Sequence, residues 1–284
     1  MLEYVNIGDG TIAYDVSGSG PLVVLAHGMG DSRHSYRFIV PELVAAGYRV
    51  ANVDIRGHGE SSAEWASYER TDIAGDLVAV VRHLGGPAVI VGQSISGGAA
   101  TIAAATAPDV LVGIVELAPF TRKQSVSLGA LLRNKHHRNG TVQLAKVMLS
   151  GSLNGWLAYL DAAIPAKPAD WNQERARIAE ALGKPERMAA FKAMTKTNPA
   201  DAGALLADVR CPVLIVEGSA DPDWADPREE GVKIINDLPD GIGELAVIDG
   251  AGHYPHTETP AQLLALLMPF LGKTLKPTTS ANNA

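Results

Sequence analysis

The sequence predicts an α/β fold in which a mostly parallel, eight-stranded sheet carries helices on both faces. Two observations predict it. Short apolar runs of strand type alternate with helical stretches over most of the 284 residues, which is typical of a parallel sheet covered on both sides. This alternation is interrupted between residues 120 and 208, where the pattern is helical and irregular, and it then resumes. We therefore predict a core domain from 1–119 and 209–273, a helical cap from 120–208 and a disordered tail from 274–284.

The strands are predicted from their composition and from the turns that bound them. The first two alternate apolar and polar residues around Gly8-Asp9-Gly10, as in a hairpin of two edge strands. The third is a continuous apolar run, as expected for an interior parallel strand. The eight predicted strands span residues 2–7, 11–16, 21–26, 48–54, 88–92, 110–117, 211–218 and 244–249.

Four helices are predicted in the core domain. The first, 35–46, is followed by Gly47, a residue typical of helix C-termini. The second, 72–84, carries its apolar residues on one stripe. Small residues dominate the third, 96–107, and the fourth, 260–271, begins with proline.

Composition limits the partners and the compartment. There are 31 acidic and 24 basic residues, and the net charge of -7 argues against nucleic acid or an anionic membrane as a partner. Cys211 is the only cysteine, so no internal disulfide is expected. Neither a signal peptide nor a membrane-spanning apolar run is evident. We therefore expect a cytoplasmic protein that acts on a small molecule, and we predict no cofactor.

The chemistry is predicted around the stretch AVIVGQSISGG, residues 88–98. A strand ends at Gly92, a helix of small residues follows, and Ser94 stands at the turn between them. This arrangement is typical of a nucleophile elbow, in which a strained turn exposes a serine hydroxyl at the end of the sheet. Two alternatives stay open: the hydroxyl caps the helix, or Ser96 is the nucleophile in a shifted register. Ser96 also stands where the usual GxSxG pattern has a second glycine.

A serine nucleophile needs a histidine base that is oriented by a carboxylate. Asp221 follows the strand 211–218, and His253 follows the strand 244–249 in a glycine-rich loop. Both residues and Ser94 thus come after strand C-termini, which is the edge where open α/β sheets gather their sites. Their order along the chain is Ser, Asp, His.

Further motifs carry a resemblance to a known family. They are LAHGMGDS at 25–32, DIRGHGES at 54–61, GSADPDW at 218–224 and GAGHYPHTETP at 250–260. Together with the elbow, they resemble the cap-bearing branch of the α/β-hydrolase superfamily. The resemblance implies an oxyanion hole formed by the backbone N–H groups of Met29 and Ile95.

Rival acids are available near the predicted site. Asp223 and Asp226 share the loop of Asp221, although the position of Asp221 relative to Gly218 fits the family better. Glu116 is the serious alternative acid, because some members of the superfamily take their carboxylate from the end of that strand. An unpaired carboxylate there would be costly to bury.

Several other polar residues receive a structural interpretation. His27, Asp54, Arg56 and His58 are expected to hold the loop and the turn beneath the site. His253 and His256 stand close together in HYPH but lack clustered cysteine or carboxylate partners at ligand spacing, so we predict no metal site. His136 and His137 are expected to form a solvated basic turn of the cap.

A substrate pocket is predicted from aromatic residues, namely Phe120, Trp156, Tyr159 and Trp171. The tryptophans and Tyr159 fit a small core of the cap equally well.

The sequence as a whole predicts a serine hydrolase of an apolar carboxylic ester or lactone that acts through an acyl-enzyme. Serine at the elbow argues against haloalkane dehalogenases and soluble epoxide hydrolases, which look similar but carry aspartate there. The alternatives are a lyase, acyltransferase, C–C hydrolase or cofactor-free perhydrolase with the same triad, and a small-molecule receptor or signalling protein with this fold.

Overall fold

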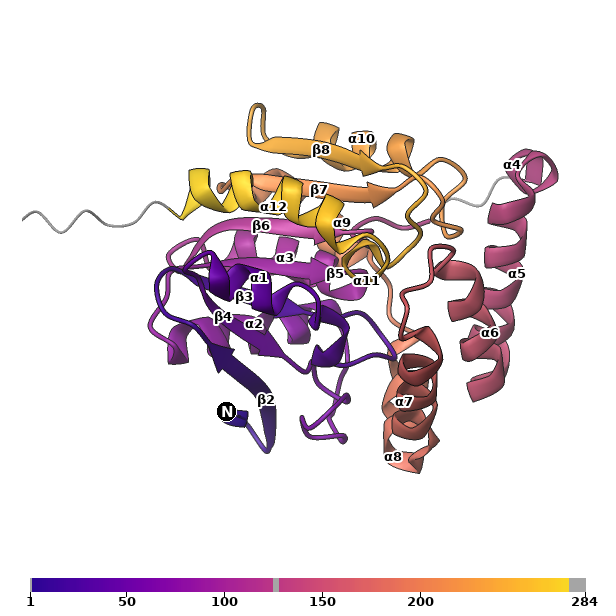
Figure 1. Ribbon diagram of the computed structural model, residues 1–284, viewed down its shortest axis with the longest axis horizontal. Coiled ribbons are helices and arrows are strands. Elements are labelled where there is room, and N and C mark those ends of the chain that lie inside the picture. Colours follow the sequence, from indigo (N-terminus) through magenta and orange to yellow (C-terminus); the bar gives the residue numbers. More distant parts are fainter. Residues whose placement is uncertain (1, 125–127, 276–284) are drawn as a thin grey trace, which may run out of the picture.

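A computed structural model describes residues 2–124 and 128–275, and an eight-stranded sheet forms its centre (Figure 1). The sheet order is β1-β2-β4-β3-β5-β6-β7-β8, with β1 and β2 antiparallel and β3 to β8 parallel. The predicted fold class is confirmed. Only β1 of the predicted edge hairpin is an edge strand, because β2 pairs with β4 on its other side. The strands are β1 (Leu2–Ile7), β2 (Gly10–Ser17), β3 (Leu22–Ala26), β4 (Arg49–Val53), β5 (Ala88–Gln93), β6 (Leu111–Leu117), β7 (Val213–Gly218) and β8 (Gly243–Ile248).

Helices of the core cover both faces of the sheet. The predicted helix 35–46 is split into a 3₁₀ turn, Arg33–Tyr36, and a short helix that begins near Pro41, a residue suited to a first helical turn. Helix α10 was not predicted from the sequence, because Glu230 and Gly231 interrupt the apolar residues of its buried face. The core helices are α1 (Val40–Ala45), α2 (Arg70–His83), α3 (Ile95–Thr106), α10 (Pro227–Asp237), α11 (Pro255–Glu258) and α12 (Pro260–Thr274).

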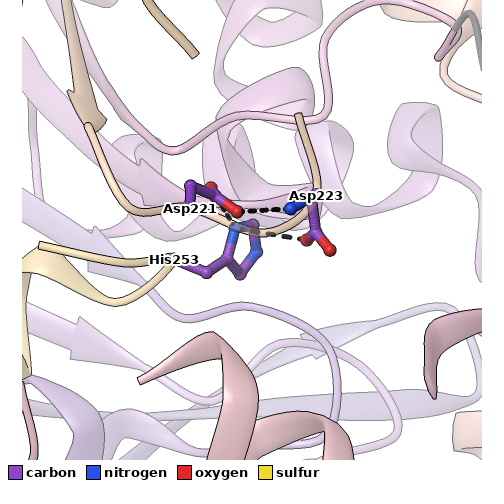
Figure 2. A group of neighbouring side chains, drawn as sticks. All are labelled: Asp221, Asp223 and His253. Carbon is purple, nitrogen blue, oxygen red and sulfur yellow. Dashed lines mark hydrogen bonds and ion pairs between the residues drawn. The ribbon is translucent and has the colours of Figure 1, made fainter. Parts of the chain in front are cut away.

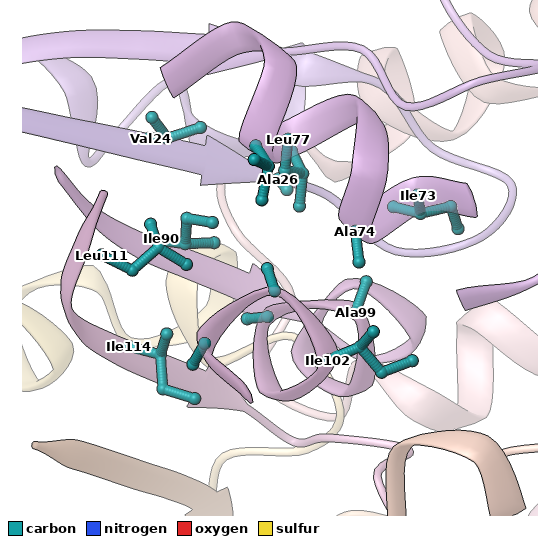
Figure 3. Close-up of a cluster of buried hydrophobic side chains, with 14 of the residues drawn as sticks. Val24, Ala26, Ile73, Ala74, Leu77, Ile90, Ala99, Ile102, Leu111 and Ile114 are labelled. Carbon is teal, nitrogen blue, oxygen red and sulfur yellow. The ribbon is translucent and has the colours of Figure 1, made fainter. Parts of the chain in front are cut away.

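Each face of the sheet has its own apolar core. On one face, side chains of α2 and α3, such as Leu77 and Ile102, pack against Ile90 and Ile114 of the strands (Figure 3). On the other face, α1 and α12 pack against Val91 and its neighbours. Burying one such aliphatic side chain contributes about 2 kcal/mol. The two layers hold the carboxyl ends of β5, β7 and β8 in fixed relative positions.

The segment between β6 and β7 is helical in its described part. Its cluster of apolar side chains includes Trp156, Leu160, Ile178 and Phe191, which pack against Tyr254 of the core. In Figure 1 these helices lie beyond the carboxyl ends of the central strands, except for the short last one, which packs against α2 and α3 of the core. They are α4 (Leu128–Arg133), α5 (Lys135–Ser150), α6 (Leu153–Ala163), α7 (Trp171–Gly183), α8 (Pro185–Met194) and α9 (Ala200–Gly203), followed by a 3₁₀ turn, Leu206–Asp208.

The C-terminal end differs in part from the predicted tail. Thr274 is the last residue of α12, and Leu275 is buried, so these two residues belong to the packed helix. The rest of the predicted tail, 276–284, lies outside the described residues. Within the described part of the chain, no helix combines the length and the apolar character needed to cross a membrane.

Candidate active site

Ser94 occupies a strained turn between β5 and α3. Its backbone has φ +56° and ψ -117°, in a region where a non-glycine residue costs about 1–3 kcal/mol. The turn requires glycine at position 92, because a Cβ there would lie 2.1 Å from the backbone oxygen of Ser96. Ser94 makes no side-chain capping bond to α3. The helix-cap alternative therefore fails for this serine.

Ser96 holds the elbow to a neighbouring loop. Its side chain is fully buried, and Oγ donates a hydrogen bond of 2.6 Å to the backbone oxygen of His27. Ser94, in contrast, lines the cavity described below. Serine in place of glycine at position 96 thus links α3 to the loop that follows β3. Because the hydroxyl of Ser96 is used in this bond, Ser94 is favoured as the residue that offers its hydroxyl to the cavity.

Asp221 and His253 meet at the same edge of the sheet (Figure 2). His253 Nδ1 and Asp221 Oδ2 are 2.8 Å apart, and both residues are buried. The side-chain amide of Gln93, next to Ser94, donates a hydrogen bond of 3.0 Å to the backbone oxygen of His253. The loop that carries His253 is thereby tied to the end of β5.

A second carboxylate, that of Asp223, approaches the same imidazole. Asp223 Oδ2 lies 3.4 Å from His253 Nδ1 and accepts a hydrogen bond of 2.5 Å from the hydroxyl of Tyr159. Burial raises the pKa of Asp223 to about 7. Burial by itself lowers the pKa of His253, but the charges of Asp221 and Asp223 outweigh it and raise that pKa to about 9. The sequence indicates Asp223 only as a rival for Asp221, whereas the structure brings both to His253.

Ser94 and His253 line one cavity of about 530 Å³. Their side chains make no hydrogen bond to each other in this structure, although both are described. Such bonds between a nucleophile and its base are often long without substrate and shorten when substrate binds. Ser94 and His253 therefore share a cavity. A hydrogen bond between them, which proton transfer needs, would form when substrate binds.

Two backbone N–H groups are available beside Ser94. Ile95 is the first residue of α3, so its N–H has no acceptor within the helix. No acceptor for the N–H of Met29 exists among the described residues. Both residues line the cavity with Ser94. The positive end of α3 adds to the field at this point.

The loop that carries Met29 is fixed by two buried histidines. His58 Nε2 accepts a hydrogen bond of 2.9 Å from Gly30 N, and His27 Nε2 accepts one of 3.2 Å from Ile55 N. Burial lowers the pKa of His27 to about 4 and that of His58 to about 3, so both rings are neutral acceptors near pH 7. These contacts agree with the structural role expected for them.

Asp54 and Arg56 also have structural contacts. Asp54 pairs with Arg33 and accepts a hydrogen bond of 2.9 Å from Glu60 N. Arg56 forms two hydrogen bonds of 2.7 Å with the carboxylate of Asp76. The turn beneath the site is therefore closed by internal ion pairs.

Glu116, the alternative acid, lies apart from His253. Its carboxyl group is fully buried between the hydroxyls of Thr101 and Thr121, with 2.6 Å to the latter. Burial raises the pKa of Glu116 to about 7, although both hydroxyls oppose the shift. The structure thus brings Asp221, and not Glu116, to the imidazole.

Three of the four predicted pocket residues line the cavity: Phe120, Trp156 and Tyr159. Trp171 does not. It packs in the apolar cluster between the cap helices, where its Nε1 donates a hydrogen bond of 3.2 Å to Asp161. Trp156 and Tyr159 belong to that cluster as well, so these two aromatics serve both the cavity and the cap.

The expectation of a solvated turn at His136 and His137 is wrong in two respects, because both residues lie in helix α5 and His137 is not solvated, whereas His136 is exposed as expected. His137 is buried, and its Nδ1 lies 2.9 Å from the backbone oxygen of Pro222. His136 Nε2 lies 2.6 Å from the backbone oxygen of Ala220. Since Pro222 and Ala220 flank Asp221, helix α5 holds the loop of the acid. Local sequence could not predict these contacts, because they join residues more than 80 positions apart.

One group in the described part of the chain has the spacing of a metal site: Asp221, Asp223 and His253, whose ligand atoms lie within 4.8 Å of one another. From the sequence, a metal was considered only for the pair His253 and His256, and His256 is not part of this group. That ring is fully buried, is stacked on Tyr36, and has no partner on either nitrogen.

Ser94, Asp221 and His253 follow the ends of β5, β7 and β8 and thus lie at the carboxyl edge of a parallel sheet, which is where α/β folds build their sites. A sequence model described as the alpha/beta hydrolase family matches residues 23–266. The chain therefore belongs to the α/β hydrolase family, as the sequence motifs predict.

Proteins similar over the whole chain act on different compounds. One is the 2-(acetamidomethylene)succinate hydrolase of Mesorhizobium japonicum, 29% identical over 274 residues that cover 94% of each protein. Another is the 2-hydroxy-6-oxononadienedioate/2-hydroxy-6-oxononatrienedioate hydrolase of Burkholderia vietnamiensis, 27% identical with 95% of each covered. A thermophilic esterase from Thermogutta terrifontis has a similar structure, with a TM-score of 0.76 at 24% identity over 97% of this chain and 99% of that one. At this level of identity, the similarity to the esterase supports the fold alone.

Proposed function

We propose that this protein is a serine hydrolase that cleaves a carboxylic ester or a lactone through an acyl-enzyme. The observation that carries the proposal is the contact of 2.8 Å between Asp221 and His253, whose side chain lines a cavity together with the strained Ser94. A hydroxyl becomes nucleophilic when a neighbouring imidazole accepts its proton. The paired carboxylate favours the imidazolium that results.

In this mechanism Ser94 Oγ attacks the carbonyl carbon while His253 Nε2 accepts the proton. The carbonyl oxygen becomes negative and is stabilised by the N–H groups of Met29 and Ile95. One such donor is worth roughly a hundred- to a thousandfold in rate. His253 then protonates the leaving alcohol, and a water molecule, deprotonated by His253, hydrolyses the acyl-enzyme. Apolar parts of the substrate would contact Met29, Leu144 and Trp156, which line the cavity.

Hydrolysis of p-nitrophenyl esters of graded chain length tests this proposal. Ser94→Ala should lower kcat by at least roughly 10⁴-fold, since the nucleophile is lost. Ser96→Ala is the matched control and should lose no more than about tenfold, because it removes one hydrogen bond. If Ser94→Ala retains the parent rate, or if Ser96→Ala loses more, the assignment of the nucleophile is wrong.

Cleavage of a bond other than an ester is the second candidate function. It is favoured by the whole-length relatives, which are named as hydrolases of an acetamidomethylene succinate and of oxo-dioates. The same triad can act on such bonds, because the fold does not fix the reaction. Product analysis with an ester, an N-acetyl enamine and a vinylogous 1,5-diketone as parallel substrates distinguishes the two candidates.

A further inference from the structure

Arg70 is a buried cation whose partners are all neutral. It is the first residue of α2 and only 5% of its surface is exposed. Nε donates a hydrogen bond of 3.0 Å to the backbone oxygen of Phe120, and Nη1 donates one of 3.1 Å to the hydroxyl of Thr197. Among the described residues, no carboxylate lies within 4.0 Å of the guanidinium, and residues 1, 125–127 and 276–284 include no Asp or Glu.

Two arginines, Arg56 of the core and Arg177 of the cap, have carboxylate partners, whereas the half-buried Arg49 and Arg187 donate to backbone oxygens. Arg56, equally buried, forms a two-bond ion pair with Asp76, and Arg177 pairs with Asp31 and Glu174 beside another hollow of the surface. A buried charge without a counter-ion is costly, so proteins usually supply one. Burial lowers the pKa of Arg70 to about 10, and the more distant Asp201 and Glu69 oppose this. The guanidinium is therefore still charged at neutral pH.

The cation faces the cavity of Ser94. Arg70 lines that cavity, and its Nη2 makes no hydrogen bond within the described part of the chain. It packs on Gly98 in the first turn of α3, where a Cβ would lie 2.9 Å from Arg70 Cδ. Gly98 is four residues after Ser94, which corresponds to about 6 Å along the helix axis.

Phe120 connects the guanidinium of Arg70 to the turn at Ser94. Phe120, whose oxygen accepts from Arg70, donates its N–H to the backbone oxygen of Ser94 at 3.1 Å. Two further cations, Lys123 and Lys196, line the cavity and are exposed. The wall near α2 is thus positive, while Met29, Leu144 and Trp156 make another part of the lining apolar.

We propose that Arg70 binds a carboxylate of the substrate, so that the preferred substrate is an ester or lactone with a second, free carboxylate a few bonds from the scissile carbonyl. This inference rests on the proposed hydrolase function. The free donors of Nη1 and Nη2 form the planar fork that matches a carboxylate. The substrate would supply the counter-ion that the fold omits. The sequence suggests an apolar ester or lactone, whereas this inference gives the substrate both an apolar part and a free carboxylate.

A matched pair of substrates tests the inference. Mono-p-nitrophenyl adipate and p-nitrophenyl hexanoate have acyl chains of the same length and differ in one terminal group, carboxylate against methyl. The parent protein should have the higher kcat/KM on the adipate ester, after subtraction of the spontaneous rate. In Arg70→Gln the ratio of the two kcat/KM values should fall by roughly ten- to a hundredfold, mainly through KM, because a charge-assisted hydrogen bond is lost.

Two further variants sharpen the result. Arg82→Gln removes an exposed arginine paired with Asp109 and should leave the ratio unchanged. Arg70→Lys keeps the charge but not the fork, so its ratio should fall between those of the parent and Arg70→Gln. Because the ratio compares two substrates on one preparation, partial unfolding of a variant does not alter it. An unchanged ratio in Arg70→Gln contradicts the inference and leaves the hydrolase proposal intact.

Binding to Ser94→Ala separates the two proposals. By calorimetry this variant should bind adipate at least roughly tenfold more tightly than 1,6-hexanediol, and Arg70→Gln should remove the difference. If neither ester is cleaved but adipate still binds through Arg70, the hydrolase proposal fails and the carboxylate site stands. If adipate and the diol bind equally, the carboxylate site is wrong whatever the protein hydrolyses.

Discussion

Two neighbouring parallel strands, β6 and β7, each bring a buried carboxyl group to the same edge of the sheet, with opposite outcomes. Glu116 of β6 is enclosed by two threonine hydroxyls and has no charged partner. Asp221, three residues beyond β7, is in contact with the imidazole of His253. Burial and position at a strand end are therefore not enough to identify a catalytic acid. The partner of the carboxylate distinguishes the two residues.

The largest expected effect follows from removing the charge of the paired acid. Asp221→Asn should lower kcat by about 10⁴-fold, because an amide can neither favour the imidazolium nor fix the required tautomer of His253. Glu116→Gln is the matched control, and we expect its kcat within about threefold of the parent. Steady-state kinetics on one ester measures both. The reverse ranking would transfer the role to Glu116.

The second carboxylate at His253 predicts a shift in the pH profile. A general base acts in its neutral form, so kcat/KM should rise with pH toward the raised pKa of His253, about 9. Asp223→Asn removes one of the two charges that favour the imidazolium, so the acid limb should move to lower pH. Asp226→Asn, which changes an exposed residue of the same loop, should leave the limb in place. A limb that stays fixed in Asp223→Asn would show that Asp223 does not influence the base.

Glu116 should instead affect stability as a function of pH. Its pKa is raised from 4.5 to about 7 by burial, so folding favours the neutral form. This contribution is complete below pH 4.5 and is lost as pH rises through 7, with a size of up to about 3 kcal/mol. In denaturant titrations, Glu116→Gln should show a smaller loss of unfolding free energy between pH 5 and 8 than the parent. Glu244→Gln, at an exposed position, should follow the parent.

The smallest expected effect is that of a chelator. Asp221, Asp223 and His253 have metal-like spacing, but the proposed mechanism uses Asp221 and His253 as a hydrogen-bonded pair. Dialysis against EDTA should therefore change kcat by less than about twofold. A large loss that added Zn²⁺ or Mn²⁺ restores would assign these three residues to a metal instead.

The sheet could be predicted closely because buried parallel strands need continuous apolar runs, and their glycine-rich ends follow from the turns they make. All eight strands lie within two residues of their predicted bounds at each end. Helix α10 escaped prediction because its buried face is partly polar. The cap helices gave no pattern from which their packing could be predicted.

The meeting of candidate site residues at one edge of the sheet was predictable where they follow strand ends, as with Ser94, Asp221 and His253. What the sequence could not provide were contacts between distant segments. The second carboxylate of Asp223, the two histidines of α5 that hold the acid loop, and the unpaired charge of Arg70 all depend on how the cap packs on the core. Trp171 was left open between the pocket and the core of the cap for the same reason, since residue type alone does not tell a pocket wall from a small core.

The most direct test of the central claim is to locate the covalent adduct of a fluorophosphonate by mass spectrometry of the digested protein. We expect one label per chain, on the hydroxyl of Ser94, and no labelling of Ser94→Ala. Modification of Ser96 or of any other residue in place of Ser94, or equal labelling of the parent and Ser94→Ala, would contradict it.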